Sequence, residues 1–570
     1  MQSQIKNIIN ETVSKKFGLK NVPDFSVDIP EKSEHGDYAC NIAMVLARTL
    51  KKNPLEIARI VDMELENWNL KNGLKTEIAP PGFINFFVDT KSLGLVLKEI
   101  IKKKEKFGSA AKKKDTVIIE YSSPNIAKPM GVHHLRTTII GQSLVNMYNF
   151  LGYKVLAMSF PGDWGTQFGS LISAYKKWGD AKKFKLSPVK EMLNLYVRYS
   201  HLAESDETLQ EEARLEFRKL EQGNKENRKI WNLFRKESFK DFDRVYKKLN
   251  IKIPLVFAES FFEPYLKEII TDAVNKKIAE QGENGSLIIK FKDNTPPLLL
   301  QKSDGATLYA TRDLAQMKYR VNKWHPSKII IVVANQQTLY FSQVFKTAEM
   351  LGYAKKENMQ HVKFGMVLDS TGKKFATREG KLIPLANVLD EAVKRARKVI
   401  EKLNSKLSIK EKNKVASIVG IGAVKFFDLS QNRLSDIVFD WDKMLNLKGA
   451  SAPYIQYSYA RVKRVIKKSK IKPSGKIKIE LLKETEELNL LRHMLHFSET
   501  IEYSALKYEP NHLAEYLLRL AEKINNFYEK VPVISAEKEI KNARLTLINS
   551  AATIIKSGMN LLGIEVVEQM

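Results

Sequence analysis

Residues 115–151 read DTVIIEYSSPNIAKPMGVHHLRTTIIGQSLVNMYNFL. The run at 117–121 is short and apolar, which is typical of a buried parallel strand. Two prolines and a glycine follow within 122–131, so we expect a loop there. From about His133, apolar residues recur at the spacing of a helix, and Gly152 follows the last of them as a stop signal. The stretch therefore predicts a strand, a loop and a helix in succession.

A second strand-like run at 154–160 extends this pattern to a βαβ unit. Such units bind ligands at the carboxyl ends of their strands, where the N–H groups of a helix N-terminus are free to bind phosphate. Two adjacent histidines, His133 and His134, open the predicted helix at this place. The first hypothesis is therefore a nucleotide site.

The charge of the chain predicts a polyanionic partner. Its 570 residues are enough for several domains, each with its own core. A net charge of +29 and a pI near 9.6 favour binding to nucleic acid or to an acidic membrane. The plain alternative is a lysine-rich surface that serves solubility.

The sequence argues against a membrane protein and against a zinc site. The longest uncharged apolar run, near 415–424, is far shorter than the roughly 18 residues of a membrane span. No charged and then apolar leader opens the chain, so we do not expect secretion. The single cysteine, Cys40, excludes intramolecular disulfides and a cysteine-based zinc site. We therefore expect a cytoplasmic protein that binds neither membrane nor zinc.

Residues 1–110 are predicted to form a small α/β domain. Its clearest strand is FINFFVD at 83–89, in which Phe83, Asn85 and Phe87 share one face. That face could stack on bases. Phenylalanines in a short strand are more often part of a core, and we prefer that interpretation.

Polar residues follow the strand-like runs of the next segment. The loop PGDWGTQFG (161–169) comes directly after the run at 154–160, and the run at 328–333 ends in Ala-Asn-Gln-Gln. Between them, at 175–250, charged residues at helical spacing predict a helical insertion. Tyr309 and Asp313 stand close together in LYATRDL. Because the carboxyl ends of parallel strands meet at one edge of a sheet, we expect these polar groups to share a ligand site.

A further strand at 363–368 leads into the loop DSTGKKFATREG (369–380). This loop places Lys373, Lys374 and Arg378 beside two glycines. A flexible cationic loop suits a triphosphate whose charge is neutralised as it reacts. Taken alone, such a loop is more often only solvated.

From 390 onward almost every segment reads as helix. Tyr454, Tyr457 and Arg461 share one helical face, and nine basic residues with no acidic one lie within 461–478. Tyrosines that stack on bases beside clustered cations would form an RNA surface. The alternative, that the tyrosines pack inside a bundle and only the lysines meet solvent, remains equally open.

These motifs together resemble class I arginyl-tRNA synthetases, nearly end to end. SSPNIAKPM followed by HLRTTIIGQ is similar to the ATP-site segment of that family, and GDWGTQFG, LYATRDLA and GKKFATREG match further catalytic segments in the expected order. HGDYACNIAM and PPGFINFF resemble its N-terminal tRNA-binding domain. GASAPYIQYSYARV and LLGIEVVEQM resemble the boundaries of its anticodon-binding domain. The joint order of the motifs leaves little room for another family.

The resemblance implies a multidomain α/β fold. It comprises a small α/β N-terminal tRNA-binding domain, a Rossmann-type catalytic domain with a parallel sheet and a helical insertion, and an all-α C-terminal anticodon-binding bundle. The expected boundaries are 1–110 for the first domain, 111–390 for the second with its insertion at about 175–285, and 391–570 for the helical region, with the anticodon-binding domain at about 445–570.

The implied reaction joins L-arginine to ATP, with Mg²⁺ accompanying the ATP, and then passes arginine to the terminal ribose of tRNA(Arg). The amino-acid carboxylate is itself the nucleophile, so catalysis should come from positioning and from charge around the α-phosphate. The resemblance implies a monomer whose activation step often needs tRNA.

The resemblance also assigns residues at positions that match the motifs of the family. The catalytic positions are His134, Lys374 and Arg378. The ATP positions are Lys128, Gly131, His133, His134 and Lys374. The arginine positions are Glu120, Asn125, Tyr309, Asp313 and Gln337. The candidate tRNA positions are Asn85, Tyr454, Tyr457, Arg461, Lys467 and Lys468.

The arginine positions make chemical sense. A guanidinium is a planar fork of five donors and is best matched by carboxylates. Asp313, with Tyr309 and Glu120, would take the guanidinium, while Asn125 and Gln337 would hold the α-amino and carboxylate groups. The alternative for Glu120 and Asp313 is a structural salt bridge with Arg312 or Arg136.

One departure from the family motivates a second hypothesis. The ATP motif usually reads His-x-Gly-His, whereas this chain has Gly131, Val132, His133 and His134. Either His133 takes over the lost phosphate contact or the site is weakened. The runner-up function is therefore a catalytically impaired relative that binds tRNA or other RNA, and a weaker third is another nucleotidyl-transferring enzyme on the same fold.

Overall fold

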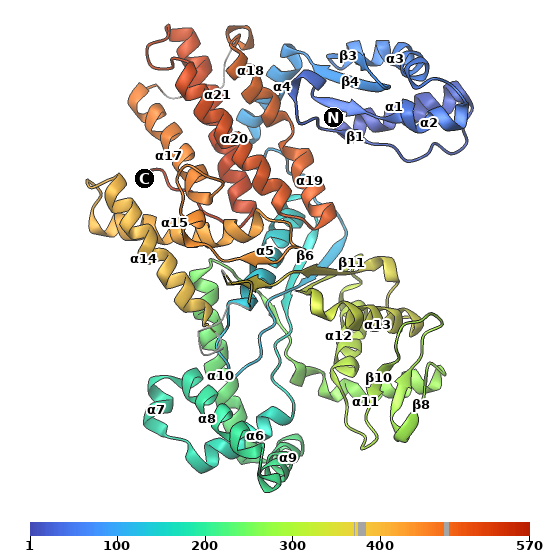
Figure 1. The fold of residues 1–570 in the computed structure, drawn as a ribbon, viewed down its shortest axis with the longest axis vertical. Coiled ribbons are helices and arrows are strands. Elements are labelled where there is room, and N and C mark those ends of the chain that lie inside the picture. Colours follow the sequence, from blue (N-terminus) through green and yellow to red (C-terminus); the bar gives the residue numbers. More distant parts are fainter. Residues whose placement is uncertain (370, 374–382, 472, 474–477) are drawn as a thin grey trace.

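The computed structural model describes residues 1–369, 371–373, 383–471, 473 and 478–570 (Figure 1). The N-terminal part forms a four-stranded antiparallel sheet in the order β1-β2-β4-β3. Within β4, Ile84 and Phe86 are fully buried, whereas Phe83 and Phe87 are half-buried on the opposite face. The elements of this part are β1 (Val27–Asp28), β2 (Tyr38–Cys40), β3 (Leu74–Ala79), β4 (Phe83–Val88), α1 (Gln2–Phe17), α2 (Ile42–Leu50), α3 (Pro54–Lys71) and α4 (Thr90–Lys103).

The centre of the molecule is a five-stranded parallel sheet in the order β12-β11-β5-β6-β7. The chain runs outward from β5 to one side and returns on the other, so the strand order reverses at β5. In sheets of this class, ligands bind at such a switch point. The strands are β5 (Thr116–Glu120), β6 (Lys154–Ser159), β7 (Leu255–Val256), β11 (Lys328–Ala334) and β12 (Met359–Phe364).

Both faces of this sheet are covered, which explains why its strands read as continuous apolar runs. On one face, Val117 and Ile119 pack with α5 (His133–Phe150) in the largest core cluster. On the other, Ile118 packs with α12 (Tyr309–Trp324) and α13 (Thr338–Met350) in a second cluster. The predicted strand, loop and helix of the first βαβ unit are confirmed.

The predicted strand at 363–368 is wrong as a single strand. β12 ends at Phe364, and the chain turns away at Gly365. The following strand, β13 (Val367–Leu368), pairs with β14 (Ile437–Val438) in a separate two-stranded sheet. The apolar run is continuous in sequence but serves two sheets.

The chain leaves the central sheet twice between β6 and β11. The first excursion is helical and ends when β7 rejoins the sheet; the second forms a three-stranded sheet in the order β10-β9-β8. The expected insertion at about 175–285 thus contains a strand of the main sheet. The elements are α6 (Thr166–Trp178), α7 (Ala181–Leu186), α8 (Pro188–Ala203), α9 (Glu207–Glu221), α10 (Lys225–Lys248), η3 (Glu259–Tyr265), α11 (Leu266–Asn275), β8 (Ala279–Gln281), β9 (Leu287–Ile289), β10 (Leu298–Gln301) and η5 (Asn335–Gln337).

The C-terminal third is helical, as expected. Its helices are α14 (Leu385–Leu403), α15 (Ile409–Leu429), α16 (Trp441–Met444), α17 (Ala452–Ser469), α18 (Thr485–Leu495), α19 (Phe497–Lys507), α20 (Asn511–Lys530) and α21 (Lys538–Leu561). α15 binds the rest of the molecule on two sides. Its Asp428 pairs with Arg136 of α5 at 3.1 Å, and its buried Lys425 donates to the carbonyl oxygen of Gly563 at 2.6 Å.

The N-terminal sheet docks on α18 and α19, beside which Figure 1 shows it. Arg492 of α18 pairs with buried Asp37, and Tyr38 donates to Glu499 of α19 at 3.0 Å. Within the described ranges, no helix has the length and apolar character needed to span a bilayer.

Candidate functional site

The histidine pair opens α5 directly beyond the carboxyl end of β5. The backbone N–H of Gly131 donates to Nδ1 of His134 at 3.1 Å, and the rings of His133 and His134 lie 3.9 Å apart at 43°. Burial, reinforced by the neighbouring His133, lowers the pKa of His134 to about 3. His134 is therefore neutral at physiological pH. With Nδ1 accepting a bond, its Nε2–H remains as a donor.

The cationic loop follows β13, and the chain returns from it to the loop before the histidines. Asp369 accepts from the backbone N–H of Lys373 at 3.1 Å, which closes a turn after β13. Lys374 and Arg378 lie outside the described residues. The chain re-enters the described part against the loop before the histidines, where Leu385 donates to the carbonyl oxygen of Met130 at 2.7 Å and Val132 donates to that of Ile383 at 3.2 Å.

Asp313 is the fifth residue of α12 and lies near Glu120, the last residue of β5. Tyr340 donates to its carboxylate, and so does the amide of Gln316 at 2.6 Å. Burial raises the pKa of Asp313 to about 6, and the charge of Glu120 acts in the same direction. Among the described residues, Asp313 has no ion-pair partner, so its carboxylate remains available to a bound cation.

Glu259 is a second buried carboxylate at this edge, and the sequence analysis missed it. It is 6% exposed, and its Oε2 has no hydrogen-bond partner among the described residues. Burial raises its pKa to about 8, and the charges of Asp313 and Asp163 add to the effect. Glu259 comes three residues after β7, so it lies beyond the carboxyl end of a parallel strand, where ligand residues are expected. That strand has only two residues, too few to be read from an apolar pattern.

Three ion pairs surround these two carboxylates. Arg320 binds Glu120 at 2.6 Å, Arg235 binds Asp163 at 2.7 Å, and Arg312 binds Glu263 at 2.9 Å. Five carboxylates thus share three guanidiniums, leaving Asp313 and Glu259 in excess. A buried cluster with two uncompensated acids is suited to a cationic ligand.

The alternative for Glu120, a structural salt bridge, is found in kind but with another partner. Neither Arg312 nor Arg136 binds Glu120; the partner is Arg320, which stands two turns after Asp313 on α12. Asp313 pairs with neither of the two arginines that this alternative named.

The remaining predicted ligand residues line the same edge. Asn125 packs against Gly162 so closely that a Cβ on that glycine would lie 2.0 Å from Oδ1 of Asn125, and the same point is 3.4 Å from Glu259. Tyr309 is 60% exposed beside this cluster, and Gln337 is exposed in the turn after β11. The structure therefore brings Glu120, Asn125, Tyr309 and Asp313 together with Glu259, whereas Gln337 has no described contact with them.

Lys128 is exposed in the loop between β5 and α5, and its ammonium lies 4.7 Å from the ring centroid of Tyr196. In the described part of the chain, no three His, Cys, Asp or Glu side chains are grouped so that they could hold a metal ion. The expected absence of zinc stays a prediction.

The helical domain carries a separate aromatic and basic surface on α17. The guanidinium of Arg461 lies 4.9 Å from the ring of Tyr457 and 5.1 Å from that of Tyr528. Arg461 also donates to Asn525, which in turn donates to Tyr454 at 3.0 Å. Both predicted tyrosines are half-buried, so each of the two open interpretations describes part of their environment.

The other tRNA candidates differ in access. Lys467 and Lys468 are exposed at the end of α17. Asn85 is only 5% exposed within β4, opposite Ala39 and Glu77. Asn85 is the least accessible of the predicted tRNA positions.

Comparisons with known proteins agree with this geometry. Family models match residues 96–441 ("tRNA synthetases class I (R), catalytic domain"), 455–570 ("DALR anticodon binding domain") and 3–88 ("Arginyl tRNA synthetase N terminal domain"). The arginine–tRNA ligase of Fusobacterium nucleatum subsp. nucleatum is 37% identical over 571 residues, covering 100% of this chain and 99% of that protein. The arginine–tRNA ligase of Clostridium botulinum strain Langeland is 38% identical and covers 99% of this chain. The chain belongs to the arginyl-tRNA synthetase family.

Arginyl-tRNA synthetases of known structure share the whole fold. The enzyme from Plasmodium falciparum has a TM-score of 0.86 at 27% identity, over 100% of this chain and 99% of that one. The enzyme from Thermus thermophilus has a TM-score of 0.85 at 23% identity, over 100% of both chains. The expected fold class and the aminoacyl-tRNA ligase class are confirmed. The comparisons lend no support to an impaired RNA-binding relative.

Proposed function

We propose that this chain activates L-arginine with ATP, giving arginyl-adenylate and pyrophosphate, and transfers arginine to the 3′-terminal adenosine of tRNA(Arg) in translation. The observation that carries the proposal is the excess of two buried carboxylates, Asp313 and Glu259, next to Glu120 at the carboxyl end of β5, the strand that precedes α5 and its histidine pair. Arginine brings two cationic groups to this place, its guanidinium and its α-ammonium.

Arginine selection follows from this charge balance. We assign the guanidinium to Asp313 and Glu259, with Tyr309 at the rim, because two carboxylates match its fork of donors. Glu120 acts through its pair with Arg320, which fixes the floor of the pocket. Asn125 and Gln337 serve the α-amino and carboxylate end.

Activation then needs placement more than acid–base chemistry. A carboxylate oxygen of arginine attacks the α-phosphorus of ATP, and the bond from that phosphorus to the pyrophosphate oxygen breaks. The Nε2–H of His134, the N-terminus of α5 and Lys128 offer donors and charge to the phosphates. We assign Lys374 and Arg378 to the departing pyrophosphate, with Mg²⁺ accompanying ATP.

Gly131 and His133 occupy the two positions at which this chain departs from the ATP motif of the family. Gly131 uses its backbone N–H to hold His134, and the exposed ring of His133 lies against that histidine at a tilt of 43°. We therefore assign the phosphate contact of the absent first histidine to His133. For tRNA we assign the α17 surface with Lys467 and Lys468, and we expect a cytoplasmic monomer.

Arginine-dependent exchange of pyrophosphate into ATP, measured with and without tRNA(Arg), tests the proposal. We expect exchange that depends on arginine and is faster with tRNA. Absence of exchange under both conditions, with tRNA still bound, would contradict it. Exchange with another amino acid would contradict the arginine assignment alone.

A further inference from the structure

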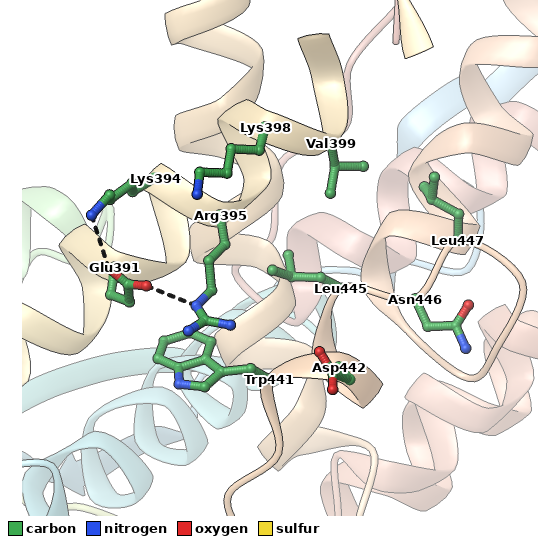
Figure 2. Close-up of a pocket in the computed structure, with 10 residues that line it drawn as sticks. All are labelled: Glu391, Lys394, Arg395, Lys398, Val399, Trp441, Asp442, Leu445, Asn446 and Leu447. Carbon is green, nitrogen blue, oxygen red and sulfur yellow. Dashed lines mark hydrogen bonds and ion pairs between the residues drawn. The ribbon is translucent and has the colours of Figure 1, made fainter. Parts of the chain in front are cut away.

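A groove of about 610 Å³ lies between α14 and α16, outside the site described above (Figure 2). Lys394, Arg395 and Lys398 line it from α14, and Trp441, Leu445 and Leu447 line it from the opposite side. Its volume is in the range of pockets that hold a nucleotide-sized ligand. We refer to it as the α14–α16 groove.

The groove contains a ready stacking platform. The guanidinium of Arg395 lies over the ring of Trp441 at 4.9 Å from its centroid, and Glu391 holds it there at 2.8 Å (Figure 2). Phe439 meets the indole edge-on at 4.8 Å. A guanidinium held over an aromatic ring forms a platform on which a base can stack, as in single-stranded RNA sites.

Two lysines flank this platform on the same helical face. Lys394 and Lys398 are four residues apart and exposed, so their side chains are neighbours along α14. Glu391 lies 3.9 Å from Lys394, but no carboxylate of the described residues pairs with Lys398. The acidic residues of the lining are Glu391, already bound by Arg395, and Asp442 at the start of α16. The free positive charge therefore stands beside the stacking face.

The place of the groove in the molecule identifies the partner. α14 starts at the ATP site, where Leu385 is bound to Met130. Arg395 comes ten residues later, about 15 Å along the helix at roughly 1.5 Å per residue. Figure 1 shows α14 between α10 and α17.

The far side of the groove is continuous with α17. Ala396 and Ile400 on the buried face of α14 share a core cluster with Tyr457, and Leu445 and Leu447 pack on the same cluster. A tRNA that reaches both the ATP site and Tyr457 passes along this helix. This continuity favours RNA over a protein or a free anion as the occupant.

We propose that the α14–α16 groove holds an unpaired nucleotide of the tRNA body. Its base stacks on Arg395 and Trp441, and its flanking phosphates bind Lys394 and Lys398. The inference rests on the proposed tRNA binding and adds a contact between the part of tRNA at the active site and the part at α17.

Two variants separate the stacking contact from the phosphate contacts. Trp441→Leu should raise the Kd for tRNA(Arg) roughly ten-fold with an unchanged salt slope, because stacking releases no counterions. Lys394→Ala/Lys398→Ala should raise the Kd and flatten the slope of log K against log salt by about 1.4–1.8, as expected for two phosphates. In both, we expect a raised KM for tRNA and a nearly unchanged kcat at saturating tRNA.

A matched control is Lys225→Ala/Lys229→Ala, which removes two exposed lysines of α10 at the same spacing. Equal effects of this control and of the α14 lysine variant would overturn the inference, since only net charge would then matter. Unchanged Kd and slope in the α14 lysine variant would also overturn it. The lysines are exposed, so this arm stands even if Trp441→Leu fails to fold. Failure of the unaltered protein to bind tRNA(Arg) would instead overturn the proposed function.

Discussion

Asp313 has no ion-pair partner among the described residues, and Tyr340 and Gln316 hold its carboxylate in place. We predict that Asp313→Ala raises the KM for arginine far more than the KM for ATP. The loss should be on the order of 2–5 kcal/mol of arginine binding, because a buried guanidinium is left unpaired. Pyrophosphate exchange at varied arginine and varied ATP measures both constants. Asp304→Ala, in an exposed turn before α12, is the control; equal effects of Asp313→Ala on both KM values would contradict the assignment.

Glu259 gives the site a pH dependence. Its pKa in the folded, ligand-free protein is about 8, above the ordinary value of 4.5. Between these pH values the folded protein holds a proton that the unfolded chain releases, so this group makes stability fall as pH rises. Arginine binding should show the opposite trend, because the charged carboxylate binds the guanidinium.

We therefore predict that Glu259→Gln weakens the pH dependence of both stability and arginine affinity. Its midpoint of thermal unfolding without arginine should fall less than that of the unaltered protein between pH 5 and pH 8.5. Its arginine affinity should be lower and should rise less with pH over 6 to 8.5. Differential scanning calorimetry and isothermal titration at several pH values measure the two effects. A variant with unaltered arginine affinity at pH 8.5 would show that Glu259 is not a ligand.

At this scale the sequence predicted which residues lie at the sheet edge better than it predicted their ion-pair partners. Asp313 and Tyr309 were predictable because they stand together in LYATRDL, near the edge where strand ends meet. The pairing of Glu120 with Arg320 was not, because α12 carries two arginines and only the tertiary packing decides which one faces β5. Glu259 escaped because its strand is too short to leave a pattern.

At the scale of elements, α5 packs unusually close to the central sheet. A Cβ on Gly141 would lie 2.2 Å from Cγ of Tyr121, an atom near the root of its side chain. We predict that Gly141→Ala is destabilising by up to about 3 kcal/mol, against which better helix propensity returns only about 1 kcal/mol. The midpoint of urea unfolding measures the effect. Asn149→Ala, exposed on the same helix, should leave it unchanged; an unchanged midpoint in Gly141→Ala would mean that Tyr121 moves freely.

The end of α17 carries the second element-scale prediction. Lys467 and Lys468 are exposed and free of ion pairs among the described residues. Replacing both by alanine should weaken tRNA binding and flatten its salt slope by up to about 1.8. Filter binding at several salt concentrations measures this. The control replaces Lys182 and Lys183, two neighbouring exposed lysines of α7. An equal change of slope in this control would mean that Lys467 and Lys468 do not contact tRNA phosphates.

The start of a helix was predictable from local spacing, whereas the division of one apolar run between two sheets was not. α5 begins at His133 as its spacing predicts, because its apolar residues recur at helical spacing from there and most of them are buried. The apolar run at 363–368 serves two sheets, and the turn at Gly365 depends on contacts with Ser435 and Asp436, about 70 positions away in the chain. Periodicity carries no information about such distant partners.

At the scale of the whole molecule, the N-terminal domain is held by charge. Burial acts against ionisation of Glu499, but the hydrogen bond with His496 and further charges outweigh it and lower its pKa to about 2. Since this is below the ordinary 4.5, the stabilisation is present above about pH 4.5 and is lost as pH falls towards 2.

We predict that Glu499→Gln loosens this docking at neutral pH without abolishing arginine-dependent exchange. Trypsin should then cut the lysine-rich segment at 104–115 faster, and the rate should depend less on pH between 5 and 3. Glu11→Gln, on the exposed side of α1, should behave as the unaltered protein. Equal cutting rates in both variants would mean that Glu499 does not stabilise the docking of the N-terminal domain.

The double attachment of α15 has a thermodynamic consequence. Asp428 binds Arg136 of α5, the helix that opens with His133 and His134, and three residues earlier Lys425 binds the carbonyl oxygen of Gly563 near the C-terminus. We propose that α15, joined in this way to both parts of the molecule, shares binding free energy between the arginine–ATP site and the tRNA site. Linkage makes that sharing reciprocal: by whatever factor bound tRNA tightens the hold on arginine and ATP, these two ligands tighten the hold on tRNA. The enzyme would then retain its nucleic acid most firmly when it is loaded to react, and release it once arginine has been transferred.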